Sequence, residues 1–212
     1  MLPARPFYLI RHGQTEANVS RTTAGGRRES PLTEKGRAQP RTLAPYLTQL
    51  ELKPQLIYHS SMIRARETAE MLNENLKLKM IELQDLREHE MGTWDGQPWD
   101  NIEPLLERGD NPPGGESEPM FAQRIQITLT GILEHAKDRL PMIVAHGGLF
   151  HAIGFLYEYA MSEVQNCHLH YFEPNTEWDV FPWRVWKFDI EGKKLVKNPA
   201  PFCLSQTLSK IA

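Results

Sequence analysis

Cysteine and an imbalance of charge are both scarce in this sequence of 212 residues, which has two cysteines and a formal net charge of −3. Two thiols, Cys167 and Cys203, are too few for a disulfide framework, and we expect both to be reduced. General nucleic-acid and membrane-surface binders owe their affinity mainly to a basic excess, which this composition lacks. We therefore expect neither nucleic acid nor membrane among the partners.

Long apolar runs, repeats and linkers are also missing. No run approaches the roughly 20 apolar residues that span a bilayer. The start, MLPARPFYLI, lacks the apolar region of a signal peptide, so the expected location is cytoplasmic. Nothing that resembles a linker divides the chain, which predicts one domain over residues 1–212 with an excursion on the substrate side at about 92–116.

The sequence contains one arrangement twice: an apolar run that ends in a histidine followed by glycine. Phe7–Ile10 leads into Arg11-His12-Gly13, and Leu140–Ala145 leads into His146-Gly147-Gly148. A buried strand delivers the residues after its end to the edge of a sheet. The planar guanidinium of Arg11 matches phosphate oxygens in a bidentate manner. A plain surface turn explains either triplet alone, but the repetition weakens that alternative.

Arg64 follows a third apolar segment, Gln55–His59, and precedes an apolar helical face that includes Ala65 and Leu72. It therefore lies at a helix N-terminus, where backbone N–H groups and the helix dipole favour an anion. The alternative, an ion pair with Glu67 three residues on, remains open because such an exposed pair contributes only a few tenths of a kcal/mol.

Two carboxylates, Glu88 and Glu90, stand among apolar and aromatic residues after the expected strand 80–83. A partly desolvated carboxyl group has a raised pKa and can donate a proton at neutral pH, whereas a solvated acidic loop would have no such role. The loop 20–30 carries three arginines that either extend an anion-binding surface or are simply solvated. Both alternatives stay open at this point.

The order of the expected elements predicts the fold class. Four expected strands alternate with helical patterns, which predicts an α/β three-layer sandwich with a mostly parallel central sheet flanked by helices. No helix separates the last expected strands, 169–172 and 183–189, so they should be antiparallel edge strands. Pro40 and Pro45 fall within the helix expected after Thr33, and they predict a kink or a break there.

Six groups of residues carry a resemblance to a known family. They are Arg11-His12-Gly13-Gln14-Thr15 with Asn18; Pro31-Leu32-Thr33 with Gly36 and Gln39; Ser60-Ser61 with Arg64-Ala65 and Thr68-Ala69; Leu86 and Glu88 with Gly92, Trp94 and Gly96; Gly114-Gly115-Glu116-Ser117; and Val144-Ala145-His146-Gly147-Gly148. In this order they resemble the histidine phosphatase superfamily, also called the phosphoglycerate mutase-like fold, over residues 7–150. The part after residue 160 is similar only in outline.

The resemblance implies a mechanism. His12 would be the nucleophile that forms a phosphohistidine, and Glu88 would be the proton donor to the leaving alcohol. The phosphate would be held by Arg11, Asn18, Arg64 and His146, the last of which would also be catalytic. Further residues are expected on the substrate side: Gln14, Thr15, Arg27, Trp94 and Gly147. Glu90 has no counterpart role in the family.

The resemblance implies no metal and no other cofactor, because arginines and histidines supply the positive charge that Mg²⁺ supplies in other phosphoryl-transfer enzymes. The cluster of Cys167, His168 and His170 suits half-buried strand positions better than a metal site. The expected partner is a small phosphoester substrate, and a homodimer is left open.

The reaction is predicted from the segment after Glu88. Cofactor-dependent phosphoglycerate mutases generally carry a longer insertion there, with extra basic residues for a carboxylate, whereas Gly96–Pro113 is short and acidic and has Arg108 as its only cation. This favours a metal-independent histidine acid-type phosphatase, a phosphomonoesterase acting on a small phosphorylated metabolite. The alternatives are a mutase-type phosphotransferase and a non-catalytic phospho-ligand binder, and intact His12 and Glu88 speak against the latter.

Overall fold

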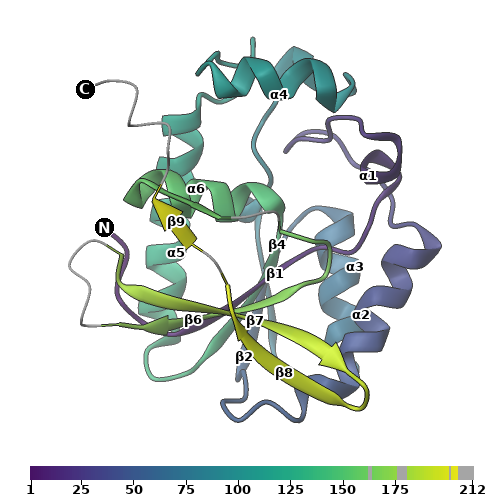
Figure 1. Ribbon diagram of the computed structural model, residues 1–212, viewed down its shortest axis with the longest axis vertical. Helices are drawn as coiled ribbons and strands as arrows, with labels where there is room; N and C mark the ends of the chain where they lie inside the picture. The colour runs from purple at the N-terminus through teal and green to yellow at the C-terminus, as the bar shows by residue number, and fades with distance from the viewer. Residues whose placement is uncertain (162–163, 176–180, 201, 205–212) are drawn as a thin grey trace.

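The computed structural model describes residues 1–161, 164–175, 181–200 and 202–204 (Figure 1). Its strands are β1 Phe7–Arg11, β2 Leu56–Ser60, β3 Met80–Leu83, β4 Pro141–Ala145, β5 Tyr159–Met161, β6 Leu169–Pro174, β7 Trp183–Glu191, β8 Lys194–Pro199 and β9 Phe202–Leu204. Its α-helices are α1 Glu16–Ser20, α2 Glu34–Leu47, α3 Ile63–Leu72, α4 Trp99–Glu107, α5 Glu118–Ala136 and α6 Gly147–Tyr157. Two short 3-10 helices, η1 Gln84–Leu86 and η2 Gly92–Trp94, lie between β3 and α4.

One mixed sheet organises the molecule, with the strand order β3-β2-β4-β1-β6-β7-β8. The strands β1, β2, β3 and β4 pair in parallel, so that Tyr8 lies opposite Met142 in the pair of β1 and β4. The strands β6, β7 and β8 continue the sheet from β1 in antiparallel pairs. The expected α/β fold with a mostly parallel core and antiparallel strands toward one edge is therefore confirmed, and the turn between β7 and β8 falls at Gly192.

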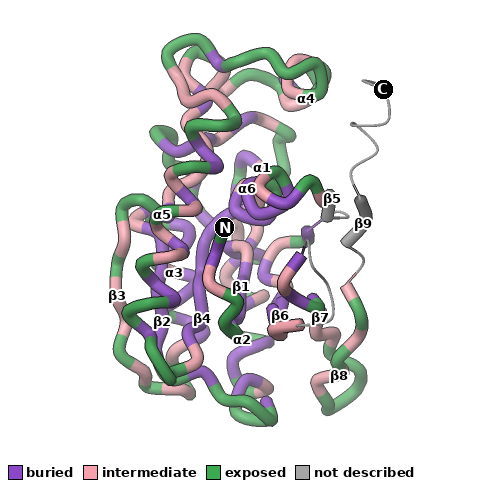
Figure 2. The backbone as a smooth tube through the Cα atoms, turned by 90° about the vertical axis from the view of Figure 1, so that its left-hand side faces the viewer, coloured by how far each residue is buried: buried purple, intermediate pink, exposed green. Residues whose placement is uncertain are grey.

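Alternating side chains of the central strands place a helical layer on each face of the sheet. Phe7 and Leu9 of β1 belong to the apolar cluster that contains α5 and α6. Tyr8 and Ile10 belong to the cluster that contains α2 and α3. Because successive strand residues point to opposite faces, the buried apolar run of β1 fills both cores at once. Figure 2 shows β2 and β4 buried along their length.

The two prolines of α2 do not break it. The helix runs without interruption from Glu34 to Leu47, with Pro40 buried inside it. Each proline costs about 3 kcal/mol in a regular helix because it removes a backbone donor and crowds the preceding turn. The buried residues Leu43 and Leu47 offset that cost, since fully burying an aliphatic side chain stabilises by about 1.5–3 kcal/mol. The predicted break was wrong because that prediction considered the backbone and not the packing, whereas a kink at these prolines stays a prediction.

Helices α5 and α6 begin in different ways. Helix α5 begins after Ser117, whose hydroxyl accepts the N–H of Met120, as its sequence predicts. Helix α6 begins at Gly147, directly after β4 and His146, so its first turn contains two residues without side chains. Of the helices in the described residues, none is long and apolar enough to cross a membrane.

Candidate active site

The candidate site lies where the three neighbouring parallel strands β1, β4 and β2 end. In open α/β sheets, ligands bind outside the carboxyl ends of the strands. Arg11 is the last residue of β1, His146 follows β4, and Arg64 lies in the first turn of α3 after β2. The N–H of His12 donates to the carbonyl of Ala145 at 2.9 Å, and the rings of His12 and His146 are 5.2 Å apart. The topology thus brings together side chains from three distant parts of the sequence.

His12 is held in one tautomer by its own neighbour. Its Nδ1 lies 2.7 Å from the carbonyl oxygen of Gly13, and His12 is 4% exposed. A carbonyl can only accept, so Nδ1 carries the hydrogen and, in a neutral ring, Nε2 carries the lone pair. Gly13 is in turn fixed by its N–H, which donates to the hydroxyl of Thr68 at 3.0 Å. His12 therefore presents one unprotonated ring nitrogen in a defined orientation.

The surroundings also favour the neutral ring. Burial is the largest cause that lowers the pKa of His12 well below 6.5, and the positive charges of Arg64 and Arg11 lower it further. At neutral pH the imidazole is uncharged, and its lone pair is available for attack on an electrophile. Burial and the two guanidinium groups thus keep the imidazole of His12 neutral.

His146 is fully buried and forms a hydrogen bond from one side of its ring only. Its Nε2 lies 2.8 Å from the hydroxyl of Ser60 at the end of β2. Its Nδ1 is buried and has no hydrogen-bond partner among the described residues. Burial followed by the charge of Arg64 lowers the pKa of His146 well below 6.5. A buried polar atom without a partner is costly, and an oxygen-rich ligand in the site would satisfy it.

Arg64 is 1% exposed and connects α3 to the loop 21–30. Its Nη1 donates to the carbonyl of Arg28 at 3.0 Å, and its Nη2 donates to the carbonyls of Ala24 at 3.1 Å and Gly25 at 3.4 Å. Burial lowers its pKa, but a guanidinium remains protonated in proteins. The alternative pairing of Arg64 with Glu67 is wrong, because that carboxylate forms an ion pair with Arg37.

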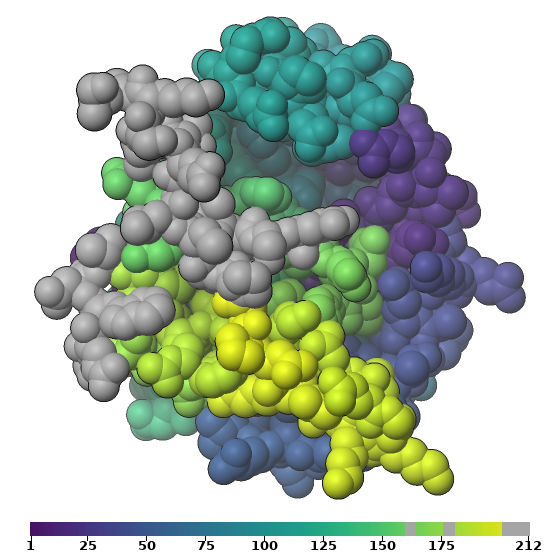
Figure 3. Space-filling model, in the orientation of Figure 1, coloured from purple at the N-terminus to yellow at the C-terminus, as the bar shows by residue number. Residues whose placement is uncertain are grey.

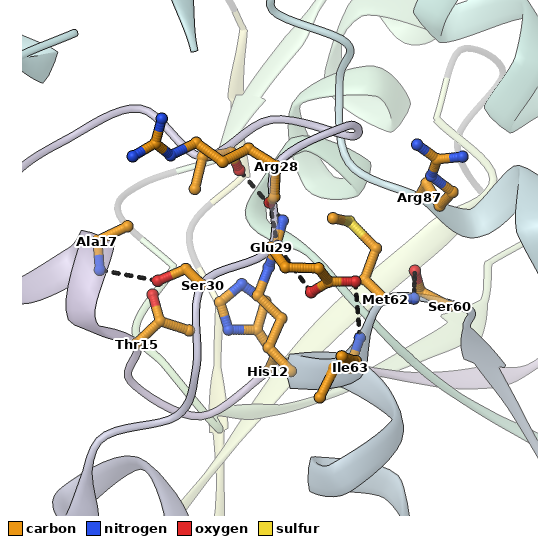
Figure 4. Close-up of polar contacts among 12 residues, drawn as sticks. His12, Thr15, Ala17, Arg28, Glu29, Ser30, Ser60, Met62, Ile63 and Arg87 are labelled. Carbon is orange, nitrogen blue, oxygen red and sulfur yellow. Dashed lines mark hydrogen bonds and ion pairs between the residues drawn. The ribbon is translucent and has the colours of Figure 1, made fainter. Parts of the chain in front are cut away.

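Glu29 also contacts the start of α3. Its carboxylate accepts the N–H of Ile63 at 3.1 Å (Figure 4). It also lies 3.8 Å from the guanidinium of Arg64. The first turn of α3 has no side-chain cap of its own, so this carboxylate satisfies one of its free donors. The loop 21–30 is thereby attached to α3 at two adjacent residues.

Arg11 precedes His12 in the chain, and Asn18 is linked to the backbone of His12 through the amide of Asn166. The Nη1 of Arg11 donates to the carbonyl of Val164 at 2.7 Å. The side-chain oxygen of Asn18 accepts from Thr15 and, at 3.1 Å, from the amide of Asn166. With its oxygen engaged in this way, Asn18 can offer an anion only its NH₂ group, which is a donor.

Glu88 is held by backbone donors on both carboxylate oxygens. Its Oε1 accepts the N–H of His89 at 2.9 Å, and its Oε2 accepts the N–H of Gly148 at 3.1 Å. A Cβ on Gly148 would lie 1.9 Å from Oε1, so any side chain here would displace the carboxylate of Glu88. The first turn of α6 thus connects Glu88 to the end of β4, where His146 lies.

Arg124 and Glu116 form a support for this segment that the sequence reasoning missed. The guanidinium of Arg124 bonds both oxygens of Glu116 at 2.7 and 2.6 Å and also donates to the carbonyls of Arg87 and Glu88. This ion pair is mostly buried, with side-chain exposures of 20% and 13%. Glu116 belongs to one of the six motif groups, which was the available signal, whereas nothing in the sequence marks Arg124.

The residues expected on the substrate side have different surroundings. Thr15 is buried and caps α1 in a reciprocal arrangement with Asn18. Gln14 uses its side-chain oxygen to accept from Thr33 at 3.0 Å. Arg27 forms an ion pair with Glu90 across to the Glu88 segment, which gives Glu90 a structural partner. Trp94 and Gly147 were also expected on the substrate side. Trp94 is half-buried in η2, and Gly147 lies against the side chain of Arg11.

The residues considered for a metal have other contacts. His168 lies 3.0 Å from Asp189, and Cys167 is a free, buried thiol. Among the described parts of the chain, no three histidine, cysteine, aspartate or glutamate side chains form a group that could hold a metal ion.

The buried histidines predict how stability depends on pH. His12 and His146 have folded-state pKa values well below 6.5, and burial lowers that of His170 to about 3. Below pH 6.5 the unfolded chain binds protons at these histidines that the folded chain does not bind. The stability that the neutral histidines contribute is therefore complete above pH 6.5 and is lost as the pH falls. Each histidine contributes a slope of up to about 1.4 kcal/mol per pH unit in that window.

We therefore expect the free energy of unfolding to fall steadily between pH 6.5 and 4.5, above the range in which the carboxylates with lowered pKa values titrate. Urea unfolding at half-unit intervals measures it. A His135→Ala variant is the control, because His135 is exposed and is not one of these three buried histidines. A flat profile in this window would contradict the assignment of neutral buried rings.

The protein is thus an α/β protein with a neutral histidine beside two guanidinium groups at the carboxyl edge of its parallel strands, and guanidinium groups match the oxygens of phosphate. The model of the histidine phosphatase superfamily (branch 1) matches residues 7–192. The chain belongs to this superfamily, as its sequence motifs predict.

Individual relatives fall into two groups by activity. The chain is 28% identical to the uncharacterized phosphatase PhoE of Bacillus subtilis (strain 168) over 193 residues, 87% of this chain and 94% of that protein. It is 31% identical to the probable phosphoglycerate mutase GpmB of Yersinia pestis (strain Pestoides F) over 153 residues, 66% of this chain and 68% of that protein. Among solved structures, a mycobacterial glucosyl-3-phosphoglycerate phosphatase superposes with a TM-score of 0.70 at 27% identity, over 93% of this chain and 99% of that one. The same protein, solved with inorganic phosphate, has a TM-score of 0.67 at 27% identity, over 90% of this chain and 98% of that one.

Proposed function

We propose that the protein is a phosphomonoesterase that hydrolyses a small phosphorylated metabolite through a phosphohistidine on His12. The observation that carries the proposal is the fixed tautomer of His12, whose Nδ1 donates to Gly13 and leaves Nε2 unprotonated. The similarity to phosphatases, one of them solved with inorganic phosphate, supports the same reading.

The first step transfers the phosphoryl group to the enzyme. The lone pair of His12 Nε2 attacks phosphorus, and the bond from phosphorus to the ester oxygen breaks. Glu88 gives its proton to the departing alkoxide, which leaves as an alcohol. Arg11, Arg64, His146 and the NH₂ group of Asn18 hold the phosphoryl oxygens, on which negative charge is spread in the transition state.

The second step returns the enzyme to its starting state. Glu88, now ionised, takes a proton from water as the water oxygen attacks phosphorus. The bond between phosphorus and Nε2 breaks, the lone pair returns to His12, and inorganic phosphate leaves. Both steps use the same groups, because the backbone N–H of Gly148 and that of His89 keep the carboxylate of Glu88 at one place.

A substrate panel tests this proposal. We expect steady release of inorganic phosphate from p-nitrophenyl phosphate and from members of a set of sugar phosphates, nucleotides, phosphoglycerates and phosphohistidine peptides. Rapid quenching should trap a phosphoenzyme that is stable to base and labile to acid. No phosphate release from any member of the panel would contradict the proposal.

The similarity to a probable phosphoglycerate mutase makes phosphoryl transfer to a second substrate the competing function. It is separated by measuring conversion of 3-phosphoglycerate to 2-phosphoglycerate with and without 2,3-bisphosphoglycerate. Conversion stimulated by the bisphosphate and faster than phosphate release would replace our proposal with the mutase reading.

A further inference from the structure

Helix α6 has an exposed face that begins at the candidate site. Its first turn contains Gly147 and Gly148, which have no side chains, and its next exposed residues are His151 and Phe155. In an α-helix, a side chain leans toward the N-terminus and covers the turn before its own Cα. His151 is three residues after Gly148 and four after Gly147, so its imidazole covers the place that these glycines leave open.

That place borders two groups of the site. The N–H of Gly148 donates to the carboxylate of Glu88 at 3.1 Å. A Cβ on Gly147 would lie 3.5 Å from Nε of Arg11, so the Arg11 side chain passes directly beside this turn. His151 therefore lies one helical turn after the two glycines that border the expected proton donor Glu88 and the side chain of Arg11.

The electrostatic surroundings of His151 agree with this position. Burial is the largest influence on the pKa of His151 and lowers it; the carboxylates of Glu88 and Glu118 oppose this shift, and the positive charge of Arg11 adds to it. The ring is nevertheless exposed to water. Water therefore reaches the ring, and a ligand in the site can contact it. Figure 3 shows the surface hollowed between α4 and α6.

We propose that His151 is a specificity residue whose imidazole hydrogen-bonds a hydroxyl group of the alcohol that leaves in the first step. A neutral imidazole has one donor and one acceptor, which suits a hydroxyl group rather than a second anion. The carboxylate of Glu118 at the start of α5 adds negative charge on this side. Phe155, which is 43% exposed, offers an apolar surface one turn further on. The substrate class is thus a phosphomonoester of an uncharged, hydroxylated alcohol such as a sugar or polyol.

This inference rests on the proposed function, and its test compares two substrates. We expect His151→Ala to lower kcat/KM for hexose 6-phosphates and glycerol phosphate about 3- to 10-fold, the range for one lost hydrogen bond. The same variant should change kcat/KM for p-nitrophenyl phosphate less than about 2-fold, because that leaving group has no additional hydroxyl. A His151→Gln variant, which keeps a donor and an acceptor, should recover part of the loss.

His135→Ala is the matched control. His135 is also an exposed helical histidine, but it lies in the last turn of α5, 17 residues beyond Glu118 and about 25 Å along the helix axis. Equal losses for both substrates in His151→Ala, or no loss for either, would overturn the assignment of His151 while the enzyme itself remains active. A wild-type protein that hydrolyses no phosphoester would instead overturn the proposed function, and the inference with it.

Discussion

Replacing His12 by alanine is expected to lower kcat for p-nitrophenyl phosphate at least about 10³-fold, because the variant has no atom that can accept the phosphoryl group. The remaining residues of the site still attract phosphate, so binding of inorganic phosphate should weaken far less than turnover. Phosphate release at saturating substrate measures the first quantity, and calorimetric titration with inorganic phosphate measures the second. The two results together separate loss of the nucleophile from loss of the binding site.

His59 provides the control for this variant. It is a buried histidine that follows the same pattern as His12, since its Nδ1 lies 3.0 Å from the carbonyl of Ser60. It lies within β2, not after its end, and we expect His59→Ala to lower stability while the folded fraction keeps most of its turnover. Undiminished turnover in His12→Ala, or no phosphoenzyme in the wild-type protein, would rule out covalent catalysis on His12.

Replacing Arg64 by lysine should affect both stability and turnover. Lysine keeps the charge but cannot reproduce the planar set of donors that reaches the carbonyls of Arg28 and Ala24. Hydrogen bonds from charged donors contribute about 1.5–3 kcal/mol each, so we expect the free energy of unfolding to fall by about 2–4 kcal/mol. Under the proposed function, weaker binding of the phosphoryl group in the transition state should lower kcat about 10²-fold, the range for one such donor in an electrostatic site.

Arg66→Lys is the matched control for this change. Arg66 lies in the same helix, half-exposed, and reaches Glu70 at 4.0 Å. Surface pairs of this kind contribute about 0–1 kcal/mol, so neither unfolding in urea nor phosphate release should change appreciably. If Arg64→Lys behaves like Arg66→Lys in both measurements, Arg64 has neither of the roles assigned to it.

The sequence predicted the strand ends of the site because the signal there is local. A buried parallel strand is a continuous apolar run, and the residues after it must lie at the carboxyl edge of the sheet. Arg11, His12 and His146 were placed correctly on that argument. Arg64 was placed correctly at a helix N-terminus because the apolar strand pattern ending at His59 is followed by the spacing of apolar residues that is typical of a helix. Their roles in chemistry remain predictions.

The contacts that orient these groups could not be predicted in the same way. Arg64 donates to carbonyls of the loop 21–30 that lie 36 to 40 residues away in the sequence. Arg124 donates to the carbonyl of Glu88, which is 36 residues away, and also binds Glu116. A backbone carbonyl has no residue-specific signature, so a sequence shows the donor but not its acceptor. The continuous course of α2 through Pro40 was missed for a related reason, because burial against α3 and the sheet is a tertiary effect.

The two edge strands of the main sheet, β3 and β8, affect how two copies of the protein can associate. Unpaired strand edges invite pairing with another chain, and natural sheets prevent it with short strands, charges and proline. β3 has only four residues and exposes Glu82, while β8 exposes Lys194 and Lys197 and ends at Pro199. The sequence leaves a homodimer open. We therefore expect any homodimer to form through helices or loops and not by continuing the sheet. Concentration-dependent protection of β8 amides in hydrogen exchange would contradict this.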